Sequence, residues 1–311
     1  MIEAKRYTRE QRKEWDDFVR NSKNGIFLFY RNYMEYHSDR FRDFSLLFLQ
    51  NGLQPVALLP ANIVGDVVYS HAGLTFGGLI CGYSMTTNLM LEISRILVEY
   101  LKSMSVKNLV YKAIPHIYHS VPAEEDLYAL FRYDAKLLKR EVTSAIPMPA
   151  ERFHKNRNWA IKKAERNHVI VEKSDDLEQF MSILTRMLVA RHELKPVHTY
   201  EEMNRLASTF PDNIKLFAAY KGDVMLAGVI VYESSNVAHA QYSANTEEGM
   251  KMGALDAVYG HLVNDYYREK RYFDFGISTE GGGRHLNIGL IRYKEAFKAR
   301  AVMQDTYELK I

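Results

Sequence analysis

The strongest constraint on the fold of this chain is an order of secondary-structure patterns that occurs twice. Apolar residues recur with a period of 3.6 in some segments and of 2 in others, which separates helices from strands. Each half runs helix, helix, three strands, helix, strand, helix, strand, and such self-similarity indicates a repeated structural unit. In the first half we expect helices at Glu14–Phe18, Arg31–His37, Leu89–Leu101 and Glu124–Phe131, and strands at Phe44–Gln50, Pro55–Ile63, Val67–Ser70, Asn108–Ala113 and Lys136–Pro147.

The second half repeats these elements. Its expected helices are Leu177–Leu188, Tyr200–Leu206, Leu255–Tyr266 and Leu286–Phe297, and its strands Lys215–Tyr220, Met225–Glu233, Val237–Ser243, Tyr272–Gly276 and Val302–Leu309. The pattern predicts a mixed α/β protein of two tandem domains, each a mixed twisted sheet flanked by helices. A length of 311 residues suits two domains of about 150 residues. We expect domains at 1–150 and 174–311, joined by a basic interdomain helix within 151–173.

Composition places the chain among ordinary globular proteins. Hydrophobic residues make up 47% of it and charged residues 25%, which excludes a disordered, collagenous or coiled-coil chain. Lys and Arg total 41 against 38 acids, a net charge of +3, so bulk charge predicts no DNA partner. The single Cys81 excludes an internal disulfide and a zinc site built from several thiolates, and we expect no metal.

The start of the chain lacks the apolar core of a signal peptide. No apolar run approaches the 18 or more residues of a membrane span. We therefore expect a cytoplasmic protein without a membrane-spanning segment.

The segment between the halves is unusually basic. From Arg152 to Arg166 it holds six basic residues and one acid, Glu165. On a helical wheel one face is apolar (Phe153, Ala160, Ile161, Ala164) and the opposite face is basic (Arg152, Lys155, Lys162, Lys163, Arg166), with Trp159 among the basic residues. One interpretation is a linker helix whose Trp159 packs against a neighbouring domain. The other is a platform for a phosphorylated ligand, with charge on phosphate and indole on a base.

Several stretches carry a resemblance to known families. They are Asn156–Glu165, Arg191-His192-Glu193, Pro196–Thr199, Ala238–Tyr242, Tyr272–Glu280, Leu286-Asn287, Tyr293–Phe297 and, in the first half, Tyr69–Gly78. With the element order, they make each half resemble the acyl-CoA N-acyltransferase fold, called GNAT. Two such units joined by a basic helix resemble the Fem family of peptidyltransferases and their acyltransferase relatives.

The resemblance implies a site for acyl-CoA, with acetyl-CoA as a representative co-substrate and no permanently bound cofactor. In GNAT enzymes splayed strands expose backbone groups to the pantetheine arm, and a helix N-terminus holds the pyrophosphate. The corresponding turn here contains Gly249, Lys251, Gly253 and Ala254. The glycines would let the backbone approach phosphate and Lys251 would add charge, although acidic residues precede them. The alternative is a plain turn before a helix.

The last predicted helix carries the leading catalytic candidate. GNAT enzymes often place a Tyr seven residues after an Asn to protonate the leaving thiolate, and the seventh residue after Asn287 is Lys294, beside Tyr293. Tyr293–Phe297 also matches the Fem pattern aromatic-Lys-x-x-Phe, although Lys298 follows where Fem proteins have Gly. The resemblance makes Lys294 an electrostatic stabiliser of developing negative charge. The alternative is a surface Lys on an amphipathic helix.

Acyl transfer to an amine also needs a group that delivers the amine neutral. Asp274, His239 and Glu280 are the candidate bases, and Asp274 stands out because a charge between two Phe residues needs a partner or a role. Tyr293 is a further catalytic candidate. The remaining candidates for substrate contact are His71, Tyr242, Arg284 and Asn287.

These residues lead to three functional hypotheses. The first is an N-acyltransferase that moves an acyl group from acyl-CoA to the amine of a small, phosphorylated or nucleotide-linked acceptor, such as an amino-sugar nucleotide or another envelope or cell-wall precursor. The second uses charged tRNA as the donor, as Fem peptidyltransferases do. The third is a degenerate GNAT fold that binds an anionic ligand without turnover. The near-neutral charge favours acyl-CoA over tRNA.

Overall fold

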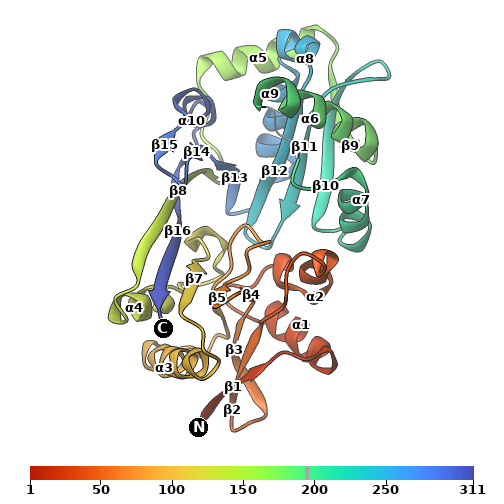
Figure 1. The fold of residues 1–311 in the computed structure, drawn as a ribbon. Coiled ribbons are helices and arrows are strands. Elements are labelled where there is room, and N and C mark those ends of the chain that lie inside the picture. Colours follow the sequence, from red (N-terminus) through yellow and green to blue (C-terminus); the bar gives the residue numbers. More distant parts are fainter. Residues whose placement is uncertain (193–195) are drawn as a thin grey trace. The chain divides into compact units, whose positions relative to one another are not determined.

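The computed structural model describes residues 1–192 and 196–311, and these divide into two compact units (Figure 1). Unit 1 comprises Met1–Glu141, Gly281–Arg284 and Met303–Ile311, and unit 2 comprises Val142–Glu280 and His285–Val302. Each unit therefore takes segments from both halves of the sequence. Within the described ranges no helix is long and apolar enough to span a bilayer.

Unit 1 holds two groups of strands around one apolar core. One sheet has the order β1-β2-β3-β6, and a second run of strands has the order β4-β5-β7-β16. The elements are β1 (Ile2–Arg6), α1 (Arg12–Arg20), α2 (Arg31–Met34), β2 (Leu46–Gln50), β3 (Gln54–Leu59), β4 (Asn62–Val64), β5 (Val67–Tyr69), β6 (Ile80–Cys81), α3 (Thr87–Ser103), β7 (Asn108–Lys112) and α4 (Glu125–Arg132), with β16 (Arg300–Lys310).

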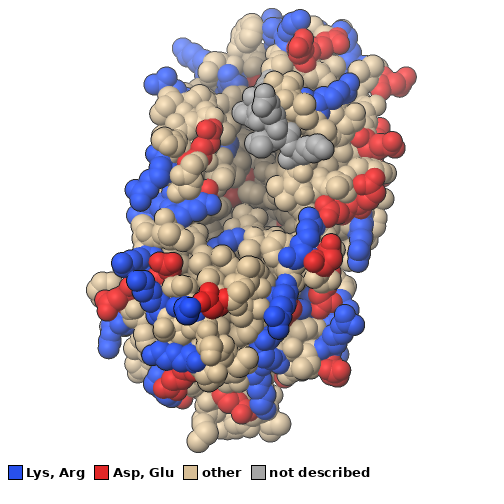
Figure 2. Space-filling view, viewed as in Figure 1, with Lys and Arg blue, Asp and Glu red and all other residues tan. Residues whose placement is uncertain are grey.

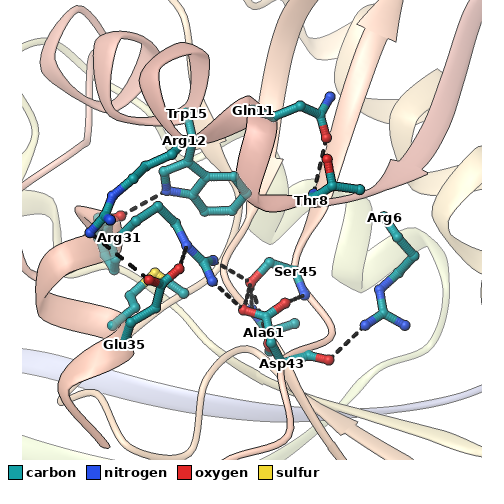
Figure 3. A network of polar contacts seen from close by, with 12 residues as sticks. Arg6, Thr8, Gln11, Arg12, Trp15, Arg31, Glu35, Asp43, Ser45 and Ala61 are labelled. Carbon is teal, nitrogen blue, oxygen red and sulfur yellow. Dashed lines mark hydrogen bonds and ion pairs between the residues drawn. The ribbon is translucent and has the colours of Figure 1, made fainter. Parts of the chain in front are cut away.

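A buried guanidinium ties the first helices of unit 1 to its sheet (Figure 3). Arg31 donates to Asp43 at 2.6 Å, to Glu35 at 3.0 Å and to Ser45 Oγ at 3.1 Å. Its guanidinium also lies 3.7 Å from the centre of the Tyr7 ring. A buried charge is tolerated only with such partners, so this network specifies how the helices dock on the strands.

Unit 2 is built on a sheet with the strand order β8-β13-β12-β11-β10-β9. Its strands are β8 (Lys136–Pro147, of which Val142–Pro147 lie in unit 2), β9 (Ile170–Ser174), β10 (Ile214–Lys221), β11 (Val224–Glu233), β12 (Val237–Asn245) and β13 (Tyr272–Ile277). Its other elements are α5 (Lys155–Arg166), α6 (Leu177–His192), α7 (Tyr200–Thr209), α8 (Glu247–Met252), α9 (Ala254–His261), β14 (Thr279–Glu280), β15 (His285–Leu286) and α10 (Ile288–Glu295).

The two faces of this sheet are covered by different helices. Val229, Ala238 and Phe273 share an apolar core with residues of α9, so we call that side the α9 face. Gly228 lies against Phe180 of α6 on the other side, the α6 face. Since neighbouring strand residues point to opposite faces, each position on β12 and β13 can be assigned to one of them.

Helix α5 packs on α9 through two glycines. A Cβ on Gly253 would lie 2.4 Å from the backbone oxygen of Ala160, and one on Gly260 would lie 2.8 Å from Ile161 Cδ1. The two glycines are seven residues apart, which places them on the same face of a helix. The helical wheel of this segment is confirmed, because Ala164 is buried and Lys155, Lys162 and Arg166 are exposed.

The structure departs from the predicted elements in a few places. The segment expected as one strand at Pro55–Ile63 is two, β3 and β4, since Pro60 between them has no N–H for a sheet bond. The last strand, β16, pairs with β7 in unit 1, whereas the end of β8 pairs with β13 in unit 2. Strand partners so distant in sequence leave no trace in local periodicity.

Candidate active site

The candidate site lies where two parallel strands separate. β12 and β13 pair only from Val237 to His239 and from Tyr272 to Asp274. Beyond these residues β12 continues beside β11, while the register of β13 against β8 is interrupted before Ile277. Ligands of open α/β sheets bind outside the carboxyl ends of parallel strands, where adjacent strands part. His239 and Asp274 are the last residues before this opening.

His239 and Asp274 form a hydrogen-bonded pair on the α6 face. Nδ1 of His239 lies 2.9 Å from Oδ2 of Asp274. The carboxylate is fully buried, and its other oxygen accepts from the hydroxyl of Thr143 and from the Gly276 N–H. Among the described residues, Nδ1 is the ring nitrogen of His239 that has a hydrogen-bond partner. The pair therefore fixes the tautomer that leaves Nε2 able to accept a proton.

The carboxyl group of Asp274 is held in its charged form. Burial, the largest effect, favours the neutral acid, but the charge of His239 and three hydrogen bonds outweigh it and keep the pKa of Asp274 below its ordinary value. A charged carboxylate at Nδ1 stabilises the imidazolium that forms when Nε2 takes a proton.

Lys294 is buried next to this pair. Its side chain comes from α10 and donates to the backbone oxygens of Gly276 at 2.8 Å and Ile277 at 2.7 Å. Burial lowers the pKa of Lys294 to about 8, an effect that the negative charge of Asp274 partly offsets. The residue is only 5% exposed, which differs from the surface lysine of the alternative interpretation.

The local backbone explains why the lysine reaches these oxygens. Gly276 has φ +76°, a left-handed conformation that glycine adopts without strain. Asn287 caps α10 by accepting from the Leu290 N–H at 3.0 Å. The carbonyls of Gly276 and Ile277 lie within reach of α10, and Lys294 donates to both.

The family comparison decides the class of this unit. A family model described as an acetyltransferase (GNAT) domain matches residues 151–295. Residues 151–295 are a GNAT acetyltransferase domain. The match makes the chain an acyltransferase enzyme, and the segment contains His239, Asp274 and Lys294. No curated protein matches the chain.

Solved structures show the fold of the whole chain. FemX superposes with a TM-score of 0.70 at 11% identity, covering 99% of this chain and 97% of FemX. L-PGS from Bacillus licheniformis superposes at 0.62 with 12% identity, covering 95% and 90%. A tandem GNAT protein from the clavulanic acid biosynthesis pathway superposes at 0.52 with 9% identity, covering 100% and 98%. The fold is thus the FemAB-like arrangement of two tandem GNAT domains.

The GNAT domain does not bring every predicted catalytic residue into the site. Tyr293 points to the α9 face, where its ring lies 5.3 Å from that of Phe297 and 4.8 Å from the guanidinium of Arg157. Burial raises the pKa of its hydroxyl well above the ordinary value. His239 and Asp274 face the opposite side of the sheet, so the structure gives Tyr293 a packing role.

Three further candidates lie outside the pair. Glu280 is exposed and accepts from Asn287 Nδ2 at 3.0 Å, so these two residues brace the start of α10. Arg284 belongs to unit 1, where it lines a cavity of about 100 Å³ beside Arg140.

Among the described residues, no group of three or more His, Cys, Asp or Glu side chains is placed to hold a metal ion.

The turn predicted to bind pyrophosphate is closed by packing. The Gly249 N–H donates to Thr246 Oγ1 at 3.0 Å. A Cβ on Gly249 would lie 2.5 Å from the backbone oxygen of Leu226. Gly253 ends α8 at φ +80° and lies against α5. Ala254 is fully buried and Lys251 is exposed. The glycines are thus required by the neighbouring backbone, which differs from the predicted approach to phosphate.

The first turn of α9 contains an acidic residue of the chain itself. Asp256, in its first turn, pairs with Arg157 of α5 at 2.5 Å. A carboxylate at a helix N-terminus already satisfies the positive end of the helix dipole. The positive end of α9 therefore already faces a carboxylate of its own helix.

The outer face of α5 is the basic surface of the GNAT domain. Trp159 is 58% exposed, and Lys163 Nζ lies 5.2 Å from its ring centre. Lys155, Lys162, Lys163 and Arg166 form no ion pair with another described residue. Figure 2 shows Lys and Arg interspersed with Asp and Glu over the visible surface. We call Lys155, Trp159, Lys162, Lys163 and Arg166 the α5 stripe.

The last two candidates lie on different units. His71 is in unit 1, only 2% exposed, at φ +62°, and burial lowers its pKa to about 3. Tyr242 follows a bulge in β12, and its hydroxyl forms a hydrogen bond of 2.7 Å with His198 Nδ1. Ser243 beside it bonds Tyr259 of α9, which leaves Tyr242 on the α6 face with His239.

Sequence reasoning missed Thr143 and His198. Thr143 touches Asp274 from a strand 131 residues away in sequence, and no local pattern signals that contact. His198 stands in the Pro196–Thr199 stretch that carried part of the resemblance, and its neighbour Thr199 caps α7. Of the stretch Arg191-His192-Glu193, Glu193 lies outside the described residues.

Proposed function

We propose that this protein transfers an acyl group from acyl-CoA to the amine of a small acceptor, with the chemistry at the opening between β12 and β13. The observation that carries the proposal is the His239–Asp274 pair beside the buried ammonium of Lys294. A base with a fixed tautomer and a cation in one desolvated place are the two groups that acyl transfer to an amine requires.

His239 acts as the general base. Its Nε2 takes the proton of the attacking amine while the new C–N bond forms, and Asp274 stabilises the imidazolium through Nδ1. The C–S bond to the carrier breaks, and the thiolate leaves with the electron pair. The proton on His239 is then available to that thiolate, so the step balances without another reactant.

Lys294 stabilises the negative charge of the leaving group. An ammonium has three N–H donors, and two are used by Gly276 and Ile277, which leaves one for a ligand. The pKa of Lys294, about 8, is close to the pKa of about 8.5 of an ordinary thiol. Below pH 8 Lys294 therefore carries the positive charge that stabilises the thiolate.

The α5 stripe supports a carrier that ends in an adenine nucleotide. Four basic side chains without ion-pair partners suit phosphate, and the exposed indole of Trp159 suits a base. Acyl-CoA and the 3′ end of a charged tRNA both offer this chemistry. The closed turn at Gly249 and Gly253 favours the tRNA donor as the second candidate, because a conventional CoA site uses that turn.

The proposed acceptor is an amino-sugar nucleotide or another envelope or cell-wall precursor, and the proposed location is the cytoplasm. The acceptor follows from the sequence resemblance, and the location from the single cysteine, since a chain without an internal disulfide suits a reducing compartment. We assign the working site to the second half of the chain, and propose the domain boundaries 1–150 and 174–311, with the basic interdomain helix within 151–173.

The test is a transfer assay that compares acetyl-CoA with aminoacyl-tRNA over a panel of amino-sugar nucleotides. Product from acetyl-CoA, lost in His239→Gln and kept in the exposed control Lys221→Ala, supports the first donor. Product from aminoacyl-tRNA alone selects the second donor. Product that persists in His239→Gln with either donor refutes the assigned base.

A further inference from the structure

The strand that carries Asp274 has a bulge just after this residue. Asp274 lies opposite Ala145 of β8 and Ile277 lies opposite Thr143, so β13 has one residue more than β8 between these two pairs. Gly276, at φ +76°, lies within this interval. Bulges are frequent next to active sites, where they turn a side chain toward the other face of the sheet.

The bulge places Ile277 on the face of the candidate base. Residues directly opposite one another in an antiparallel pair point to the same face. The hydroxyl of Thr143 touches Asp274, so Thr143 lies on the α6 face, and Ile277 opposite it lies there too. Strict alternation along β13 would instead have turned Ile277 to the α9 face, where Phe275 packs.

The strands β14 and β15 continue this face as a two-stranded ribbon. Thr279 lies opposite Leu286, and beside this pair the Asn287 N–H donates to the Ser278 oxygen at 2.9 Å. The same register, carried one residue further, brings Ile288 opposite the residue that follows the bulge. Since side chains alternate along each strand, every second residue of the ribbon lies on the face of the site.

Three exposed apolar side chains therefore share that face. Ile277, Leu286 and Ile288 are 39%, 45% and 50% exposed. Apolar residues scattered singly over a surface need no explanation, whereas a set of them on one face beside a site is typical of a binding surface. We call these three residues the apolar rim.

The apolar rim begins at a residue that is bonded to the catalytic lysine. The backbone oxygen of Ile277 accepts from Lys294 Nζ at 2.7 Å, and the oxygen of Gly276 accepts at 2.8 Å. An ammonium has a third N–H, which a negatively charged group of a ligand can take. A ligand with such a group and a hydrocarbon tail thus finds a cation and an apolar surface side by side.

We propose that the site takes acyl groups with a hydrocarbon chain longer than that of acetyl, and that the apolar rim holds this chain. The statement that the chain belongs to a transferred acyl group rests on the proposed function. The binding of a hydrocarbon at the rim does not depend on the carrier. Each methylene group that the rim removes from water should raise affinity by up to about fourfold, the equivalent of about 0.8 kcal/mol.

The experiment titrates the full chain with sodium acetate, butanoate, hexanoate and octanoate at pH 7, followed by NMR. These carboxylates place a negative charge at Lys294 without any carrier. We expect affinity to rise by at least about tenfold from acetate to octanoate, the gain from covering two methylene groups or more. Lys294→Met should weaken binding at every chain length and keep this rise.

Variants of the rim assign the rise to its residues. Leu286→Ser and Ile288→Ser should each remove much of the gain from acetate to octanoate. The matched control is Ile170→Ser on β9, where an isoleucine that is 63% exposed lies outside the rim, and this variant should keep the full gain. Equal affinity for all four carboxylates in the wild type, or an equal loss of the gain in the rim variants and in Ile170→Ser, overturns the proposal.

Transfer assays with acetyl-CoA and octanoyl-CoA separate this inference from the proposed function. If the carboxylates bind as expected and neither ester supports transfer, the proposed donor is wrong and the apolar rim stands. If acetyl-CoA supports transfer while carboxylate affinity ignores chain length, the proposed function stands and the rim has no part in it.

A lipid surface is the competing occupant of the rim. Sedimentation with phosphatidylcholine vesicles tests it on the wild type and on the two serine variants of the rim. Vesicle binding that both variants lose, together with carboxylate affinity that ignores chain length, would make the rim a membrane contact and refute an acyl-chain site.

Discussion

The ring of His239 bonds a carboxylate, Asp274, that is fully buried and accepts two further hydrogen bonds. The two residues are aligned in register at the last paired position of the parallel strands β12 and β13. Neither can rotate away without leaving a buried charge unpaired. The register between β12 and β13 thus fixes the position of His239 Nε2 at the point where the two strands separate.

Asp274→Asn should lower acyl transfer by two to four orders of magnitude, because an amide favours the wrong tautomer of His239. The side chain keeps its shape, so we expect circular dichroism melting to stay close to the wild type. The measurement is kcat beside the melting curve of each protein. Wild-type kcat in a folded Asp274→Asn variant would remove Asp274 from the mechanism.

Lys294 should impose a falling limb on the pH profile of transfer. Its folded-state pKa is about 8, below the ordinary value of 10.5, because burial disfavours the ammonium. The charged form that stabilises the leaving group is therefore lost as pH rises through 8. We expect kcat to fall tenfold for each pH unit above 8, and Lys294→Arg, which stays charged, to lack that limb if it retains activity. A flat wild-type profile between pH 7 and 10 contradicts the assigned role.

The same pKa makes a prediction about stability. Between pH 8 and 10.5 the unfolded chain binds more protons at this lysine than the folded one, so the free energy of unfolding rises with pH in that window. Between pH 7.5 and pH 10 the rise amounts to about 2.4 kcal/mol in the wild type relative to Lys294→Met. Urea unfolding of both proteins at pH 7.5 and pH 10 measures it, and parallel changes in the two proteins would place the ammonium in solvent.

Much of this architecture could be predicted because its signals are local. Apolar periodicity located most helices and strands, and the helical wheel of α5 separated the buried Ala164 from the exposed Lys155 and Lys162. The contacts that build the site are not local. The bond between His239 and Asp274 depends on strand register, and Thr143 arrives from β8. Sequence patterns predicted the residue types of the site without their partners.

Two predicted roles changed, each for its own physical reason. Gly249 and Gly253 carry a glycine spacing typical of a phosphate turn, yet the backbones of β11 and α5 occupy the space that their missing side chains leave. Tyr293 is adjacent to Lys294 in sequence, but successive helix residues point about 100° apart. It therefore reaches the apolar core while Lys294 reaches the site.

Gly253→Ala should therefore act on packing. The new Cβ would lie 2.4 Å from the Ala160 oxygen, and the residue already has φ +80°. We expect a loss of about 2–4 kcal/mol in the free energy of unfolding, from strain and overpacking together. Gly222→Ala is the matched control, since it has φ +57° and nothing within 4 Å, and it should lose only about 1–2 kcal/mol. Equal losses in the two variants would argue that α5 does not press on Gly253.

Lys298 gives a prediction of the opposite sign. It follows Phe297, where the Fem pattern has glycine, and it adopts φ +71°. A non-glycine residue in this conformation costs about 1–2 kcal/mol, and the ion pair that Lys298 forms at 3.6 Å is with an exposed carboxylate, Glu151. Lys298→Gly should raise the free energy of unfolding by about 0.5–1 kcal/mol, as measured in urea. A loss of stability would mean that the lysine stem supplies more than the backbone strain costs.

The α5 stripe should decide between the two donors through the salt dependence of binding. Each phosphate contact made by a lysine contributes about 0.7–0.9 to the slope of log K against log salt for a nucleic acid. With tRNA as ligand, Lys162→Ala should reduce that slope by about 0.7–0.9, the contribution of one contact. Trp159→Ala should weaken binding by about 1–3 kcal/mol at every salt concentration. Lys221→Ala, on β10 and away from the stripe, is the control and should change neither quantity. If CoA binds and tRNA shows no salt-dependent affinity, the stripe serves the acyl-CoA donor. If both stripe variants bind both ligands as the wild type does, the stripe has no part in holding the carrier.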